Sequence, residues 1–467
     1  MDPDASRSQT SLPNDRSRPA TPARRNRRLV AMVAVAAVLA VAAVWQYAGR
    51  LEGPRPAPPA QDWLDVADPL PDGSAPAPDP EVAALKHEAT QAVRRLLEEF
   101  PETAEALDVA ALLHLRFGRV DQAERCWNRC LELNPQSASA HFALGSLARN
   151  KGDFPKAAEH FRRATEIDAE SPQVFHELAD VFLKQGDLDR AQAAVEQGLE
   201  RDPRFFPGLY QLGQIHLQRG DYAKARKALE AAVPLGSDFA GVYFALVTAC
   251  TKLGDAEQAA VYAEKFRKAR AGEEASHRDS LRAPRDSASD LRHGVAEVYT
   301  AASRVYLLYG QAQAAERLLV RASELGPTWA ECGDMLARLY EQQGRLDEAL
   351  ATLSRFSLSA PRSIAIQVHL GRLAAEAGRF ELAEQACQKA IELSPGEARA
   401  YAMLADLYLR SDRKLAEARR LAEKAVELAP EAPLYRLLSV ACQKTGDVAG
   451  ARAASQKASA VAPGSGQ

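Results

Sequence analysis

Residues 141–164 read HFALGSLARNKGDFPKAAEHFRRA, and near-copies of this stretch recur along the chain. Apolar residues spaced three and four apart predict one helix over 138–150 and a second helix just after it. Between them, Gly152 can adopt the left-handed conformation that ends a helix, and Asp153 can cap the next helix. Phe161 stands on the apolar face of the second helix, where it is expected to fill the gap between neighbouring units.

The turn glycine of this stretch recurs at a fixed spacing. It stands every 34 residues at positions 118, 152, 186, 220 and 254, and in a second register at positions 310, 344, 378 and 446. An Ala follows each of these glycines by five residues. A single helix pair cannot bury its own apolar stripe, so the units are expected to stack into a solenoid. The register breaks between Phe266 and Ala296, which divides the repeats into two blocks of five units.

This pattern resembles the tetratricopeptide repeat family, in which an aromatic, a Leu-Gly pair, a second aromatic, an Ala, a Phe-like residue and a Pro follow one another. The third unit carries the match in Phe175, Leu178, Ala179, Phe182, Gly186, Ala191 and Pro203. The resemblance covers about 104–463 and departs at Asp412, which replaces the turn glycine of the ninth unit. It implies an all-α fold, a right-handed superhelical solenoid of antiparallel helix pairs that binds a protein or peptide in its concave groove.

A transmembrane helix is expected before the repeats, over residues 29–48. These residues carry no charge and would span about 30 Å as a helix, the thickness of a hydrocarbon core. Four arginines between residues 24 and 28 precede the segment, so the basic tail 1–28 is expected to be disordered and cytoplasmic. The repeats would then be extracytoplasmic, and periplasmic in a bacterium. A cleaved signal peptide is the alternative, although bulky Trp45 and Tyr47 occupy the place of its cleavage site.

The composition predicts the boundaries of the remaining segments of the chain. Residues 49–80 are rich in proline and are expected to form an extended linker, followed by a capping helix over 81–103. The two repeat blocks would cover 104–273 and 296–467. The charged residues 274–295 between them are expected to be an insertion, either a lengthened helix with a solvated loop or a docking element.

Nothing in the sequence indicates an enzyme, a cofactor or a metal. The chain lacks the glycine-rich phosphate-binding patterns, the GxSxG pattern and the HExxH pattern, and its nine histidines are scattered. Its six cysteines form no CxxC pair and are expected to be buried free thiols. The formal net charge is −3 and no strongly basic domain follows residue 49, so no nucleic-acid partner is expected.

Candidate binding residues form two columns on the first helices of the units. The aromatic column contains Phe142, His176, Tyr210 and Phe244, one from each of four consecutive units. These rings could line a groove for a peptide, or could pack between adjacent helices. The arginine column contains Arg304, Arg338 and Arg372. These side chains could hold carboxylates or an anionic polymer, unless Asp334 and Glu341 neutralise them in local salt bridges.

The sequence therefore predicts a scaffold that is anchored in the lipid bilayer through residues 29–48 and binds partner proteins or peptides. The alternative is a structural subunit of an envelope assembly or of a polymer-export complex.

Overall fold

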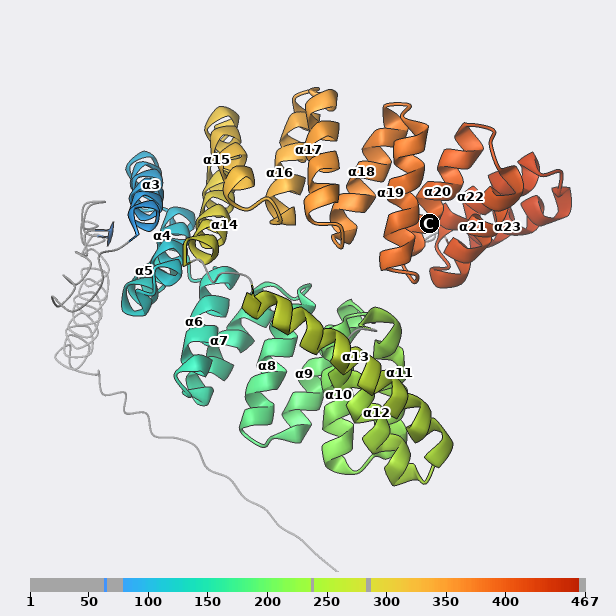
Figure 1. The fold of residues 1–467 in the computed structure, drawn as a ribbon, viewed down its shortest axis with the longest axis horizontal. Coiled ribbons are helices and arrows are strands. Elements are labelled where there is room, and N and C mark those ends of the chain that lie inside the picture. Colours follow the sequence, from blue (N-terminus) through green and yellow to red (C-terminus); the bar gives the residue numbers. More distant parts are fainter. Residues whose placement is uncertain (1–62, 65–78, 237–238, 283–286, 462–467) are drawn as a thin grey trace, which may run out of the picture. The chain divides into compact units, whose positions relative to one another are not determined.

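The computed structural model describes residues 63–64, 79–236, 239–282 and 287–461 (Figure 1). The chain divides into two compact units, Met1–Pro58 and Pro59–Gln467, and all described residues belong to the second unit. The expected tail, transmembrane helix and most of the linker lie outside the described residues. Among the helices of the described ranges, none is both long and apolar enough to cross a bilayer.

The described residues contain helices and no strand. The first array begins with α3 (Pro80–Glu99). The helices that follow are α4 (Ala104–Arg116), α5 (Val120–Leu133), α6 (Ala138–Asn150), α7 (Phe154–Ile167), α8 (Pro172–Lys184), α9 (Leu188–Arg201), α10 (Phe206–Arg219), α11 (Tyr222–Ala232), a 3₁₀ turn (Val233–Leu235), α12 (Ala240–Leu253) and α13 (Ala256–Arg282).

The second array contains α14 (Ser287–Leu308), α15 (Ala312–Leu325), α16 (Ala330–Gln342), α17 (Leu346–Ser359), α18 (Ile364–Glu376), α19 (Phe380–Leu393), α20 (Ala398–Arg410), α21 (Leu415–Leu428), α22 (Ala432–Lys444) and α23 (Val448–Val461). In both arrays successive helices pack as pairs, and each pair packs on the next. The expected all-helical solenoid is therefore confirmed.

The repeat unit has the local structure that its sequence predicts. The first helix of the opening stretch is α6, and Gly152 follows it with a φ of +80°. The Asp153 carboxylate then accepts a hydrogen bond from the backbone N–H of Lys156 at 3.2 Å. Phe161 is fully buried, and the ring lies so close to Gly145 that a Cβ there would stand 3.0 Å from it. The glycine thus makes room for the ring between the paired helices.

The ninth unit shows how the fold accommodates a missing turn glycine. Asp412, at the glycine position, takes a φ of +51°, and Lys414 takes a φ of +47°. Left-handed backbone is unfavourable for residues with a Cβ, although Asp tolerates it better than most. This turn has one residue more than the turns of the other units, and the left-handed backbone of Lys414 accommodates the extra residue. Helix α21 begins directly after Lys414.

The second array packs against the beginning of the first array. Helix α14 packs against α3 and α4, so α3 supports both arrays (Figure 1). Val93 and Leu97 of α3 share one buried core cluster with Val295 and Tyr299 of α14. Two ion pairs tie α3 to the second array, Glu81 with Arg292 at 2.8 Å and Glu88 with Arg321 at 2.8 and 2.9 Å.

The charged residues 274–295 are divided between two helices. Helix α13 has 27 residues and extends through residue 282, and α14 begins at residue 287. The buried face of α14 already starts at Ala288 and Leu291, within the expected insertion. This segment therefore supplies packing that the sequence pattern did not reveal.

Two residues of the expected linker also pack on the solenoid. Trp63 and Leu64 are helical, and Leu64 belongs to the buried core cluster that contains α3 and α4. The prediction of an extended spacer is wrong at these two positions, because their apolar side chains find a buried site beside α4.

Candidate functional site

The aromatic column lies on α6, α8, α10 and α12, and three of its members are half-buried. The ring of Phe142 packs edge-on against Phe161, with centroids 5.6 Å apart. His176 Nδ1 lies 3.0 Å from the side-chain oxygen of Gln211 in the next unit. Tyr210 packs edge-on against Phe239 of the next unit, with centroids 5.1 Å apart. The structure thus places these three rings in contacts within or between units.

Phe244 differs from the other three residues of the column. Its side chain is 61% exposed, with the Phe266 ring of α13 at 5.8 Å between centroids. Tyr210 finds its partner in the following unit, whereas the unit after α13 is built on α3 and α4 instead. Phe244 is exposed because the first array ends at this point.

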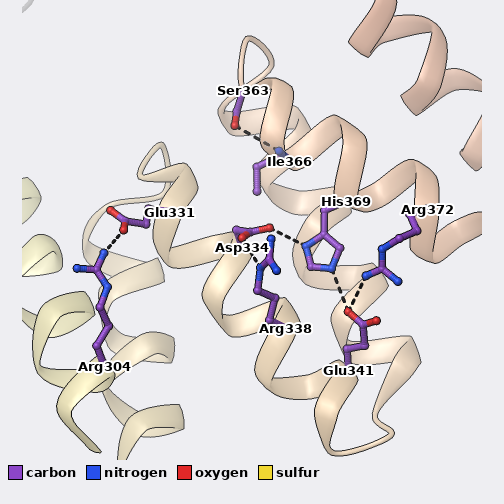
Figure 2. A network of polar contacts seen from close by, with 9 residues as sticks. All are labelled: Arg304, Glu331, Asp334, Arg338, Glu341, Ser363, Ile366, His369 and Arg372. Carbon is purple, nitrogen blue, oxygen red and sulfur yellow. Dashed lines mark hydrogen bonds and ion pairs between the residues drawn. The ribbon is translucent and has the colours of Figure 1, made fainter. Parts of the chain in front are cut away.

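The arginine column lies on α14, α16 and α18, and each guanidinium is paired (Figure 2). Arg304 pairs with Glu331 of α16. Arg338 Nε donates to Asp334 Oδ2 at 2.6 Å. Arg372 donates to Glu341 at 2.7 Å and to Glu376 at 3.0 Å. Of the two interpretations of this column, the structure places the arginines in local salt bridges.

His369 lies at the centre of this network, although it belongs to neither of the two predicted columns. Its side chain is only 5% exposed. Nδ1 lies 2.6 Å from Asp334 Oδ1, and Nε2 lies 3.2 Å from Glu341 Oε2 (Figure 2). His369 therefore contacts a carboxylate with each of its two ring nitrogens. The network joins α16 to α18.

The network shifts the pKa of both carboxyl groups. Burial alone would raise the pKa of Asp334, but hydrogen bonds from His369 and Arg338 hold it below its usual value. The hydrogen bond from Arg372 lowers the pKa of Glu341, and His369 adds to this effect. Both carboxyl groups are therefore ionised where the network is intact, and they balance the nearby cations.

A signal for this network is present in the sequence. Asp334 and His369 are 35 residues apart, as are His176 and Gln211, which also contact each other. A spacing of one repeat plus one residue therefore marks neighbouring positions on successive first helices.

Asp108 stands 34 residues before Phe142 and therefore holds the position of the aromatic column in the first unit. It accepts a hydrogen bond from Trp127 Nε1 at 2.7 Å. Burial raises the pKa of Asp108, and the Trp127 hydrogen bond opposes this change. This carboxyl group is engaged in packing α4 on α5.

An apolar groove opens on the first helices of the last two units. It has a volume of about 660 Å³, and Met403 of α20 and Leu434 and Leu437 of α22 lie half-buried in its lining. Asp406 lines the same groove and stands 34 residues after Arg372, so the groove continues the wall that carries the arginine column. Arg204, from the turn before α10, also lines it.

The cysteines confirm the prediction of buried free thiols. All six are buried and unpaired. Burial raises the pKa of Cys126, Cys130, Cys332 and Cys387 to about 12, so these thiols are poor nucleophiles at neutral pH. In the part of the chain that the structure describes, no three His, Cys, Asp or Glu side chains gather as a metal site.

Comparison with known proteins identifies the repeat. Tetratricopeptide repeat family models match residues 109–172, 176–240 and 335–398, and a further tetratricopeptide repeat model matches residues 398–431. No curated protein matches the chain.

Several solved structures have a similar fold over part of the chain. A crystal structure of MamA is 19% identical, covers 34% of this chain and 94% of its own, and has a TM-score of 0.33. MamA from Desulfovibrio magneticus RS-1 is 20% identical, covers 36% of this chain and 94% of its own, and has a TM-score of 0.33. Pseudomonas aeruginosa PilF is 17% identical, covers 54% of this chain and 99% of its own, and has a TM-score of 0.32. The family matches identify residues 109–172, 176–240 and 335–431 as tetratricopeptide repeats, and these residues form helix pairs in the structure.

Proposed function

We propose that the chain is a non-catalytic scaffold, anchored in a membrane by residues 29–48. It binds a partner protein on the surface that the first helices of the repeat units form together. The repeat family supports protein binding, since stacked helix pairs present an extended continuous surface. The function requires no covalent step, and its specificity comes from the side chains that line this surface.

The apolar groove over α20 and α22 is the observation that carries this proposal. Met403, Leu434 and Leu437 offer an apolar floor, while Arg399 and Asp406 offer charges at its sides. An apolar side chain of a partner peptide would lose its contact with water there, and the charged groups would orient the peptide backbone. The groove therefore suits a peptide segment, extended or helical, with apolar side chains.

The salt bridges of the arginine column favour this partner over an anionic polymer. Arg304, Arg338 and Arg372 each face a carboxylate of the same chain. An anionic polymer would have to displace these carboxylates, which reduces the gain from binding the arginines.

The experiment compares partner capture by matched variants. The intact protein is purified from gently solubilised membranes, together with a double variant, Met403→Glu with Leu437→Glu. We expect the double variant to lose a protein that co-purifies with the wild type, while its helical circular dichroism signal is retained. The control is Leu358→Glu, since Leu358 is 84% exposed on α17, away from the groove lining. Equal recovery of every partner by the wild type and the double variant would contradict the proposal.

The anchor has its own test. The full chain should stay in the membrane pellet after an alkaline carbonate wash, and a chain without residues 29–48 should move to the supernatant. Protease added to the extracytoplasmic side should degrade the repeats. A full chain that is released by carbonate would contradict the anchor and leave the groove proposal standing.

A further inference from the structure

Two histidines of the second repeat unit face each other across its helix pair. His141 of α6 and His160 of α7 place their Nδ1 atoms 3.1 Å apart. The ring centroids are 5.4 Å apart and the ring planes are tilted by 46°. Both residues are half-buried, so solvent can reach the pair from one side. The two rings therefore offer two nitrogens at one partly open place.

The second unit differs from all other units at these two positions. Where the second unit has His141, the other units carry Leu, Phe, Tyr, Gly or Gln, and where it has His160 they carry Ala, Cys, Leu, Thr or Tyr. The other units thus use these positions mainly for apolar or aromatic packing between the paired helices. Placing polar rings there costs free energy unless their nitrogens find a partner. Both histidines occur in the same unit, where they meet.

The backbone determines which nitrogen of His141 carries its hydrogen. Nε2 of His141 lies 3.3 Å from the backbone oxygen of Pro135. A carbonyl oxygen only accepts, so in the neutral ring the hydrogen is on Nε2, and Nδ1 presents its lone pair toward His160. Histidines that bind a metal commonly donate their second N–H to a backbone carbonyl in the same way. His141 is therefore oriented as a metal ligand would be.

His160 can supply the second lone pair without losing a proton. Burial lowers the pKa of both His141 and His160, so both rings are mostly neutral at pH 7. In the neutral pair, Nδ1–H of His160 donates to Nδ1 of His141. When that hydrogen moves to Nε2 of His160, its Nδ1 gains a free lone pair and the ring stays neutral. Metal binding then requires a change of tautomer and no change of charge on the ligands.

The distance between the two nitrogens suits a common metal ion. Two nitrogens that are each about 2.0–2.1 Å from a divalent metal, at an angle of about 90–109°, stand about 2.9–3.4 Å apart. The observed 3.1 Å lies within this range. The ion would lie beside the line that joins the nitrogens, so each ring must turn slightly to aim its lone pair. The torsion that turns a histidine ring is broad, so this adjustment costs little.

The charges around the pair are compatible with a cation. Three carboxylates and two cations act on the rings, namely Glu124, Glu159, Glu166, Lys156 and Arg163. Arg163 pairs with Glu166 at 2.9 Å, and Lys156 lies 3.6 Å from Glu124. These two pairs largely compensate each other. Glu159 is exposed and acts on both rings, so it adds a negative charge that favours a bound cation.

We propose that His141 Nδ1 and His160 Nδ1 together bind one divalent transition-metal ion of the kind that prefers imidazole nitrogen, such as Ni²⁺, Cu²⁺ or Zn²⁺. Water completes the coordination on the open side of the pair. The ion links α6 to α7 within the second unit. The site depends neither on the membrane anchor nor on the apolar groove over α20 and α22.

The test titrates Ni²⁺ into the detergent-solubilised full chain, purified without a polyhistidine tag, by isothermal titration calorimetry at pH 7.5. We expect the wild type to bind one ion. His141→Gln and His160→Gln should each bind it at least about tenfold more weakly, because each leaves a single imidazole. The control is His87→Gln, which removes an exposed histidine of α3 and should bind Ni²⁺ like the wild type.

A second measurement on the wild type does not require the variants to fold. With less than one equivalent of Cu²⁺, electron paramagnetic resonance should show hyperfine structure from two imidazole nitrogens. The site is overturned if the wild type binds no Ni²⁺, if either His141→Gln or His160→Gln binds it as the wild type does, or if His87→Gln weakens binding equally. A Cu²⁺ spectrum with fewer than two nitrogens would overturn it as well.

Discussion

His369 Nδ1 of α18 lies 2.6 Å from Asp334 Oδ1 of α16, and the two residues belong to successive repeat units. Contacts of this kind add directional hydrogen bonds to the apolar packing between successive helix pairs. Since His369 also contacts Glu341, a single side chain links two carboxylates to the next unit.

Replacing His369 by Ala should destabilise the second array. The change removes the His369 contacts of Asp334 and Glu341 at a half-buried place, and leaves them only the hydrogen bonds from Arg338 and Arg372. A hydrogen bond to a charged group contributes about 2 kcal/mol. We expect an earlier urea midpoint for the second array. Arg379→Ala is the control, since its pair with Asp347 is exposed and its loss should change stability by less than about 1 kcal/mol. Equal midpoints for the two variants would contradict the role of His369.

Acid should weaken the same array. The pKa values of Asp334 and Glu341 are lowered in the folded chain, so the stability they contribute is fully present above their unfolded values, near pH 4. It is lost as the pH falls through the lowered, folded values. Asp334→Asn should therefore show a shallower loss of stability below about pH 4 than the wild type, measured as urea midpoints at successive pH values. Parallel curves would show that Asp334 does not carry this dependence.

Replacing the three arginines of the column by Ala should change stability more than binding. Arg304, Arg338 and Arg372 are paired with carboxylates, and partly exposed pairs contribute about 0–1 kcal/mol each. We expect a lower thermal midpoint together with unchanged recovery of partner proteins, since none of the three lines the apolar groove. Loss of a partner without a change in thermal midpoint would instead make the arginines part of a binding site.

Glycines at close helix contacts should resist substitution. A Cβ on Gly333 would stand 2.5 Å from the buried ring of Phe356, so Gly333→Ala should destabilise the array by about 1–3 kcal/mol through overpacking. Gly272 of α13 has no atom within 4 Å of such a Cβ, and there Ala should be neutral or stabilise by up to about 1 kcal/mol. Thermal unfolding of the two variants gives the comparison, and a stable Gly333→Ala protein would mean that Phe356 can move aside.

Local signals in the sequence predicted much of the fold. The helix over 138–150, the left-handed Gly152 and the cap at Asp153 depend on neighbouring residues only, and all three are present in the structure. The packing of α14 on α3 and α4 could not be predicted in this way, because it joins segments far apart in the chain and the repeat spacing contains no information about it.

The candidate site was less predictable than the fold. The repeat spacing placed Phe142 and Arg338 on the correct helices. It could not predict whether their side chains are packed or exposed, because that depends on the residues of the neighbouring unit. His369 stands three residues before Arg372 and 35 residues after Asp334, one more than the repeat spacing, so it belongs to neither column and was missed for that reason. Trp63–Leu64 was missed because the surrounding prolines indicate a linker, and the contact of Trp63 with His114 joins residues far apart in the chain.

Site-specific photocrosslinking in intact cells tests the central claim most directly. A photoreactive amino acid is placed at Leu437, in the groove, and at Leu358, outside the groove lining and 84% exposed. The scaffold account predicts a light-dependent adduct with another protein at Leu437 and none at Leu358. No adduct at Leu437, with or without one at Leu358, would contradict partner binding in this groove.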